Sequence, residues 1–404
     1  MTLCSLQHFL IYAFAFLGPL GTLLTPSFLP DAFRSYQFLL CFFPLFFLKF
    51  NVSNWKMILS FLPFLFYCIF SAFSTHQRPY YEDAYPLFRS FLLAAQTLFI
   101  LGGAYSYTGE KTRLIKLYLG GYFISLAVGY LFFLGYYTHF ISLETIKRFS
   151  IETQIGWNLL RFSPGTYPNE YGNISSFALA TLLIFFAHKK RFLTLVMICL
   201  TFIALLLTTT RAAYLSFLIS LIYLSFLSQE IRKLMALLSL LGIALISILK
   251  MYSIDFIKIF VGGIKTISFN GGSVGMRVAA WIKGFFDLND HILWGNGFGS
   301  DIYAHNVYLE LLFELGLIGI LVLIVTIVYY LSSHHQGLKY FFEKKKSLMG
   351  MITTTALIHV FLFALTNHNL HHHLTSFSFL LFNLYLFSGK TDVVKASYFA
   401  RIEA

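Results

Sequence analysis

Charged residues are scarce in this sequence. Aspartate, glutamate, lysine and arginine make up 11% of the 404 residues, whereas soluble globular proteins contain about 25%. Hydrophobic residues make up 58% and aromatic residues 19%, and no long polar stretch or internal repeat suggests a second domain. The composition excludes a soluble protein with one anchor. It predicts an all-α polytopic membrane protein with a single integral membrane domain over residues 1–404.

Several chemical signatures are absent as well. The sequence has no Walker A motif and no His-Glu-x-x-His motif, which argues against an ATPase or a zinc peptidase of those classes. Its four cysteines lie singly in or beside apolar runs, so we expect neither disulfides nor a cysteine metal site. The net charge of +12 would suggest nucleic acid binding in a soluble protein. Here the basic residues cluster between apolar runs, so we attribute them to membrane topology and expect no nucleic acid partner.

Apolar segments of helical length recur along the chain, and we predict about 12 transmembrane helices from them. These segments lie near residues 7–28, 36–50, 56–73, 87–107, 114–137, 173–188, 192–209, 212–228, 234–252, 307–331, 349–366 and 374–388.

Basic residues in short loops predict the orientation, because they favour the cytoplasmic side. One alternate set of loops holds 17 lysines and arginines, and the short loops of the other set hold 4, which are Arg34, Arg78, Arg89 and Arg211. We therefore expect both termini to be cytoplasmic. The two long loops, 138–172 and 253–306, would lie outside, and the second would separate helices 9 and 10.

One histidine lies where the second long loop meets an apolar run. The glycine-rich stretch Gly295-Asn-Gly-Phe-Gly299 leads into His305 and Asn306, and the run 307–331 follows. A histidine can accept a proton near neutral pH, although a polar residue at the end of a membrane segment needs no special role. Glycines also let backbone N–H groups approach an anion closely. His305 is thus a candidate base beside a candidate anion-binding loop.

Three arginines fall in the same outer loops and turns. Arg211 follows three threonines in a very short turn, and Arg277 lies one turn from Trp281 on a predicted amphipathic helix over 274–286. Arg161 precedes a turn rich in proline and glycine. The planar fork of arginine suits phosphate oxygens, whereas a snorkelling interface arginine is the alternative for Arg211. With His305, these residues indicate group transfer from an anionic, lipid-borne substrate such as a lipid diphosphate.

The last predicted outer loop contains four histidines. Clustered histidines can bind zinc or copper, but no carboxylate or cysteine accompanies them. A polar cap or a pH-sensitive patch explains them equally well. We therefore expect no metal and no cofactor at His368, His371, His372 and His373.

Taken together, the motifs resemble the O-antigen ligase/polymerase superfamily, most densely over residues 161–320. The motifs that carry the resemblance are Gly165-Thr-Tyr-Pro-Asn169, Thr210-Arg211, Arg277-x-x-x-Trp281, Trp294-Gly-x-Gly-Phe-Gly299, Ala304-His305-Asn306-x-Tyr308-Leu309-Glu310 and Glu314-x-Gly316-x-x-Gly319.

The resemblance implies a GT-C-type glycosyltransferase that is metal-independent and inverting. The donor would be an undecaprenyl-diphosphate-linked glycan at the periplasmic face of the bacterial inner membrane. The acceptor would be lipid A–core, as in lipopolysaccharide biosynthesis. His305 would act as the base or position the acceptor, supported by Asn306 and by Asp301, which lies one helical turn earlier if that turn is helical.

The resemblance also implies that Arg211 and Arg277 bind the diphosphate, with Arg161 as a weaker addition. An O-antigen polymerase, which extends a second lipid-linked repeat unit, shares the outer loop and stays an alternative. A protein O-oligosaccharyltransferase is a third reading. From another class, a lipid-linked oligosaccharide transporter or flippase should carry polar residues along the middle of several spans. In this sequence the charged residues concentrate at segment ends, which disfavours that class.

Overall fold

A computed structural model describes residues 2–24, 34–48, 52–73, 85–149, 155–156, 159–251, 272–300, 304–367 and 370–402. Over these residues the structure is helical, apart from an antiparallel pair of two-residue strands, β1 (Ile155–Gly156) and β2 (Leu159–Leu160). The all-α prediction is confirmed. The α-helices are α1 (Leu3–Leu17), α2 (Gln37–Leu40), α3 (Val52–Phe73), α4 (Tyr85–Ser106), α5 (Lys111–Tyr137), α6 (Leu143–Phe149), α7 (Pro168–His188), α8 (Phe192–Leu207), α9 (Arg211–Leu227), α10 (Gln229–Met251), α12 (Gly272–Asn289), α13 (Val307–Ser333), α14 (His335–Lys344), α15 (Leu348–Ala364) and α16 (His373–Ile402).

Several of these helices can cross a membrane. Within the described ranges, five are long and apolar enough: α1 with the 3₁₀ helix η1 (Gly18–Leu20), α4 from Pro86, α5, α7 and α13. The pair α14 and α15, bent by 107°, would make a sixth. Shorter apolar helices occur in α3, α8, α9 and α16. A polytopic membrane protein is therefore confirmed, and the count of about 12 spans stays a prediction.

One predicted span has a different structure. Residues 36–50 were expected to form a single helix, but the described part contains only the four-residue α2 and the 3₁₀ helix η2 (Phe43–Phe46). Pro44 lies at the start of η2 and has no N–H to donate, so an α-helix cannot run through it undisturbed. The segment instead packs against α4, where the absence of a side chain at Gly102 lets Phe46 approach. The prediction of a continuous helix here was wrong.

The helices pack around two main apolar regions. The larger one gathers buried side chains of α1, α5, α7, α9, α15 and α16, among them Phe14, Tyr118 and Phe177. The second lies between α3, α4 and α13 and contains Phe64, Leu93 and Leu311 among its buried side chains. Helix α7 is surrounded by other helices, since 78% of its span is buried. An apolar helix of this kind belongs in the interior of a bundle.

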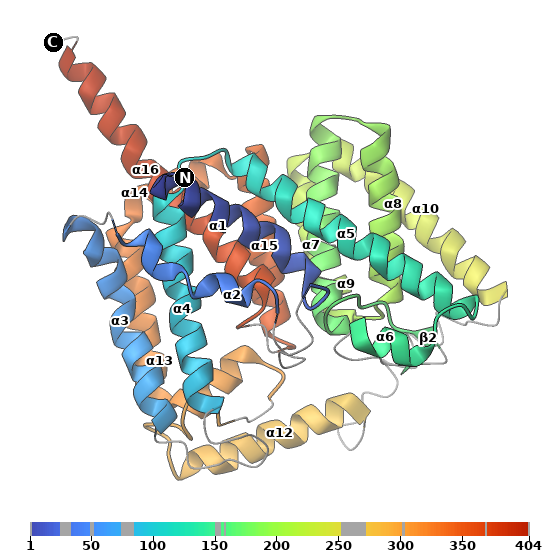
Figure 1. The fold of residues 1–404 in the computed structure, drawn as a ribbon, viewed down its shortest axis with the longest axis horizontal. Coiled ribbons are helices and arrows are strands. Elements are labelled where there is room, and N and C mark those ends of the chain that lie inside the picture. The colour runs from blue at the N-terminus through green and yellow to red at the C-terminus, as the bar shows by residue number, and fades with distance from the viewer. Residues whose placement is uncertain are drawn as a thin grey trace.

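Helix α12 differs from the others in direction. Figure 1 shows it lying across the ends of α3, α4 and α13, at the end of the molecule opposite both termini. Its bounds confirm the helix predicted over 274–286. This crosswise helix carries Arg277 and Trp281 past the start of α13, and so it organises the candidate site.

Candidate functional site

Residues 304–306, which we call the His305 turn, are held in place on both sides. The Trp281 indole Nε1 donates a hydrogen bond to the Ala304 carbonyl at 2.6 Å. Asn306 caps α13, because its side-chain oxygen accepts the backbone N–H groups of the second and third helix residues at 3.0 and 3.1 Å. Between these anchors His305 has a φ of 48°, a left-handed conformation that is uncommon outside glycine and clusters at functional sites. The partly exposed imidazole therefore projects from a fixed backbone.

Two of the predicted arginines lie close together. Arg277 is on α12, one turn before Trp281, and Arg211 is the first residue of α9. Burial lowers the pKa of the Arg277 guanidinium below its ordinary value, and the positive charge of Arg211 lowers it further. Two cations held near each other repel, and a multivalent anion between them would convert that repulsion into attraction. Helix α12 thus links this pair of cations to the His305 turn.

Arg161 binds the protein itself. Its Nε donates to the Thr208 carbonyl at 2.8 Å, and its terminal nitrogen donates to the side-chain oxygens of Asn169 and Thr210, each at 3.1 Å. These contacts tie the first long loop and the start of α7 to the turn before α9. Arg161 therefore stabilises the turn from which Arg211 projects.

A buried ionic cluster that the sequence reading missed lies beneath the His305 turn. The Arg89 guanidinium contacts the Glu314 carboxylate at 2.6 Å and the Glu310 carboxylate at 3.7 Å. It also lies over the Phe298 ring, 5.1 Å from the centroid, and its Nε donates to His371 Nε2 at 3.4 Å. The Glu314 side chain is fully buried. Arg89 thereby connects α4, α13, the glycine-rich loop and the last outer loop.

The glycine-rich loop wraps around α13 and directs three of its N–H groups into the protein. The N–H of Gly297 donates to the Glu314 carbonyl at 3.0 Å, and that of Asn296 to the Phe313 carbonyl at 2.9 Å. The N–H of Phe298 donates to the Ser71 hydroxyl at 3.0 Å. The loop's three glycines have φ of 75°, 98° and 84°, which other residues adopt poorly. The N–H groups of Asn296, Gly297 and Phe298 are thus bonded within the protein, to α13 and to Ser71, so these three are not donors to a substrate anion in this structure.

The turn before this loop provides hydrogen-bond acceptors at a break in α13. Gly316 has φ 63° and ψ −170°, which divides the helix into an outer part that follows Asn306 and a longer inner part. The first N–H groups of the inner part, at Leu317 and Ile318, donate to the Ile292 and Leu293 carbonyls, each at 3.0 Å. A helix can break near a membrane only where other protein groups satisfy its backbone. The break therefore separates the part of α13 that follows His305 and Asn306 from the longer apolar part.

A second buried ion pair lies near the first. Arg34 contacts Glu170 of α7 at 2.6 Å, and the Thr166 hydroxyl also donates to that carboxylate. The Tyr36 hydroxyl donates to the His371 carbonyl at 2.7 Å. The last outer loop is thus fixed between two arginine–glutamate pairs. The sequence analysis had used Arg34 and Arg89 only as markers of topology.

The histidines of the last outer loop, which lies between α15 and α16, have different neighbours. His373 is buried and pairs with the Phe14 carbonyl at 2.9 Å, whereas His372 lies beside the Phe363 ring. Loss of hydration lowers the pKa of His371 well below its ordinary value of 6.5, and the nearby Arg89 lowers it further. In the part of the chain that the structure describes, no three histidine, cysteine or acidic side chains are grouped so as to hold a metal.

Three expectations fall on positions outside the described residues. They concern Asp301 as a partner of His305, His368 as a member of the histidine cluster, and Arg78 as an outer-loop charge.

The two acidic residues of the buried cluster around Arg89 had a visible signal in the sequence. Glu310 and Glu314 are acidic residues at the start of an otherwise apolar run. A charged side chain at such a position usually pairs with a group of opposite charge.

A comparison of the sequence with models of known protein families tests the resemblance described above. Residues 195–324 match a family model described as O-antigen ligase. The resemblance to the O-antigen ligase/polymerase superfamily is confirmed. The matched segment contains Arg211, Arg277 and His305, together with both acidic residues that face Arg89. The family includes ligases and polymerases, which are glycosyltransferase-like enzymes with lipid-linked glycan substrates. No curated protein matches the chain.

Proposed function

We propose that this protein is an O-antigen ligase, which transfers a glycan from an undecaprenyl-diphosphate-linked donor to lipid A–core in lipopolysaccharide biosynthesis. One observation supports the proposal most. Helix α12 carries Arg277 beside Arg211 and, one turn later, carries Trp281, which anchors the residue before His305. One helix thus connects a pair of cations with the turn that holds a candidate base.

The chemistry assigned to these residues is an inverting displacement. The imidazole of His305 accepts the proton of an acceptor sugar hydroxyl, and the hydroxyl oxygen attacks the anomeric carbon of the donor. The bond between that carbon and the diphosphate oxygen breaks, and the diphosphate leaves with the electron pair. Arg211 and Arg277 stabilise the negative charge that develops on the leaving group. The leaving group supplies the driving force, so the proposed reaction uses neither nucleotide nor metal.

The other predicted residues take supporting roles. Arg161 holds the turn before Arg211 through three hydrogen bonds and is assigned a positioning role instead of direct diphosphate binding. Asn306 fixes the start of α13 and hence the His305 backbone. Asp301 is kept as a proposed partner of His305 on sequence grounds alone.

The proposed orientation puts this site in the periplasm and both termini in the cytoplasm of a bacterial inner-membrane protein. It rests on the distribution of basic residues in short loops. Figure 1 is in keeping with it, because both termini lie at the end of the molecule opposite α12.

The proposal is tested with purified protein in vesicles that contain the lipid-linked donor and lipid A–core. We expect His305→Ala to reduce the transfer rate by about 10²–10⁴-fold, which is the usual contribution of a general base. Arg277→Lys keeps the charge but loses the forked geometry and should also reduce transfer strongly. Arg191→Lys, at an exposed position before α8, is the matched control. Wild-type rates for both site variants would refute the assigned roles.

A further inference from the structure

A buried polar contact joins three helices close to the turn that carries Arg211. Ser176 of α7 and His359 of α15 are both fully buried, and the Ser176 Oγ lies 2.6 Å from the His359 Nε2 atom. The Ser176 hydroxyl also donates to the Ala213 carbonyl of α9 at 3.0 Å. Ala213 is the third residue of α9, two positions after Arg211. The contact therefore reaches the first turn of the helix that begins at Arg211.

The imidazole of His359 makes a second contact with α9. Its Nδ1 atom lies 2.8 Å from the Thr355 carbonyl, and because a carbonyl only accepts hydrogen bonds, this nitrogen carries the proton. The Ser220 Oγ of α9, 3.2 Å from the same nitrogen, accepts a second and longer bond. In the neutral ring the Nε2 atom is then an acceptor, so the single proton of Ser176 is shared between Nε2 and the Ala213 carbonyl. One imidazole thus holds α9 at two places.

These two attachments lie on one face of α9. Ala213 and Ser220 are seven positions apart, which is two helical turns and about 10 Å along the axis. Apolar helices in a membrane have little hydrophobic force between them, and hydrogen bonds from serine and histidine help to fix how they meet. Because the bonds lie at both ends of a two-turn segment, they fix the tilt of α9 as well as its rotation.

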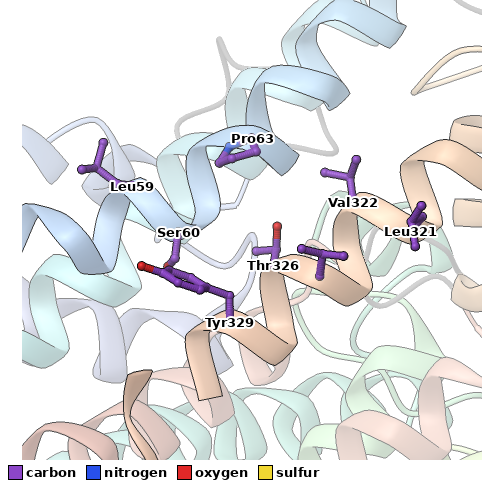
Figure 2. A pocket seen from close by; sticks show the side chains of 8 residues that line it. Leu59, Ser60, Pro63, Leu321, Val322, Thr326 and Tyr329 are labelled. Atoms are coloured by element: carbon purple, nitrogen blue, oxygen red, sulfur yellow. The ribbon is translucent and has the colours of Figure 1, made fainter. Parts of the chain in front are cut away.

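Apolar contacts alone do not close every helix interface of this protein. Between α3 and α13 an opening of about 600 Å³ is lined mostly by apolar side chains. Figure 2 shows Leu59 and Pro63 of α3 on one side of it and Val322 of α13 on the other. The contact of α7 with the start of α9 is closer, since a Cβ atom added at Gly172 would lie 2.8 Å from the Thr210 Cβ. Close approach and directional hydrogen bonds therefore occur together where α9 begins.

We propose that His359 and Ser176 position Arg211 for the donor diphosphate, an inference that rests on the proposed function. Arg161 holds the turn before Arg211, and the His359 contact holds the first turns of α9. A side chain on a helix surface lies about 5–6 Å from the axis, so a rotation of α9 by about 20° would move it by about 2 Å. A displacement of about 1 Å can slow a reaction about 10²-fold. His359 is thus a positioning residue that acts through Arg211.

Binding of undecaprenyl diphosphate to the purified full-length protein tests the proposal without any transfer. We expect Ser176→Ala and His359→Leu each to raise the dissociation constant about tenfold. His359→Gln, which keeps a polar group near the Nε2 position, should restore most of the affinity. Ser378→Ala is the matched control and should bind as the wild type does, because Ser378 is a buried serine whose hydroxyl donates within its own helix, to the Leu374 carbonyl at 2.6 Å. Wild-type affinity of both Ser176→Ala and His359→Leu would overturn the proposal.

A double-variant series separates positioning from a general loss of structure. Because His359 acts through Arg211, His359→Leu should not weaken binding further when Arg211→Ala is already present. Equal losses in both backgrounds would mean that His359 only supports the fold, which would contradict the proposal. In transfer, His359→Leu should raise the KM for the donor and leave the KM for the acceptor unchanged, whereas a smaller folded fraction would change neither KM.

The outcome is separable from the proposed function. If Arg211→Ala binds undecaprenyl diphosphate as tightly as the wild type, the diphosphate-binding role of Arg211 fails, and the positioning role fails with it. If Arg211→Ala binds weakly and His359→Leu binds normally, only the positioning role fails. Weak binding by both variants of a protein that transfers no glycan would count against the ligase and support the positioning role.

Discussion

Removal of Arg89 should destabilise the protein more than removal of an exposed charge. Arg89→Ala leaves the fully buried Glu314 carboxylate without the guanidinium that contacts it at 2.6 Å. Breaking a buried ion pair from one side costs about 3–5 kcal/mol, because the remaining charge stays in a poorly polarisable environment. Glu314→Leu removes the other charge, and Arg89→Ala combined with Glu314→Leu removes both. That double variant should lose much less than the sum of the two single losses.

Transfer should fall together with stability in the single variant. Glu314 ties the outer part of α13 to α4 through Arg89, and that part directly follows His305 and Asn306. The assay is reversible unfolding in detergent for the wild type, both single variants and the double variant, with transfer measured on the folded fraction. Glu230→Gln is the control, since Glu230 and its partner Lys190 are exposed and their pair, at 3.1 Å, should matter little.

Two results would refute this reasoning. Arg89→Ala could leave the free energy of unfolding at the wild-type value, which would mean that the pair is not desolvated as the structure shows. Alternatively, the effects of the two single substitutions could add in the double variant. Additivity would mean that Arg89 and Glu314 do not act on each other.

Three further predictions follow from the same geometry. Trp281→Phe removes one hydrogen bond to the residue before His305, worth about 1 kcal/mol, and should slow transfer about fivefold. Gly316→Ala should cost at least about 1–3 kcal/mol, because an alanine there is held in a left-handed conformation and its methyl group would lie 2.4 Å from a backbone nitrogen. Gly103→Ala, whose methyl group would make ordinary van der Waals contact with Ile11 and Leu380 at 3.6–3.8 Å, should be neutral. The wild type should lose stability as pH falls below 6.5, since His371 takes up a proton more readily when unfolded, and His371→Gln should reduce that loss.

Each of these predictions has a result that would count against it. Normal transfer by Trp281→Phe would show that the indole does not position His305, and Trp294→Phe, at an exposed position, controls for the loss of an indole elsewhere. Wild-type stability of Gly316→Ala would contradict the break in α13. An unchanged pH profile for His371→Gln would assign the acid sensitivity to another group.

Local features of the site could be predicted from the sequence because they depend on neighbours in the chain. The His305–Asn306 segment was placed at a helix start, and the structure shows Asn306 capping α13. The spacing of Arg277 and Trp281 predicted one helix face, and α12 provides it. Period and capping are properties of a few consecutive residues, so no knowledge of the fold was needed.

Contacts between distant segments could not be predicted in this way. Arg89 and Glu314 are 225 residues apart, and nothing in the local sequence pattern of either segment indicates that the two are in contact. The glycine-rich stretch shows the same limit. Its glycines do allow close approach of the backbone, but the group that approaches is α13 of the same chain. Residues 36–50 were taken for a span because their composition is apolar, although Pro44 interrupts the helix in the described part.

The most direct test of the proposed ligase is a transfer assay with the wild-type protein. Purified protein in vesicles receives an undecaprenyl-diphosphate-linked glycan, first with lipid A–core and then with further lipid-linked repeats alone, without nucleotide and with a chelator present. We predict glycan attached to lipid A–core in the first mixture and no extended chains in the second. Longer chains on the lipid carrier alone would identify a polymerase. If neither product forms from substrates that a known ligase and a known polymerase can use, the glycosyltransferase assignment is contradicted.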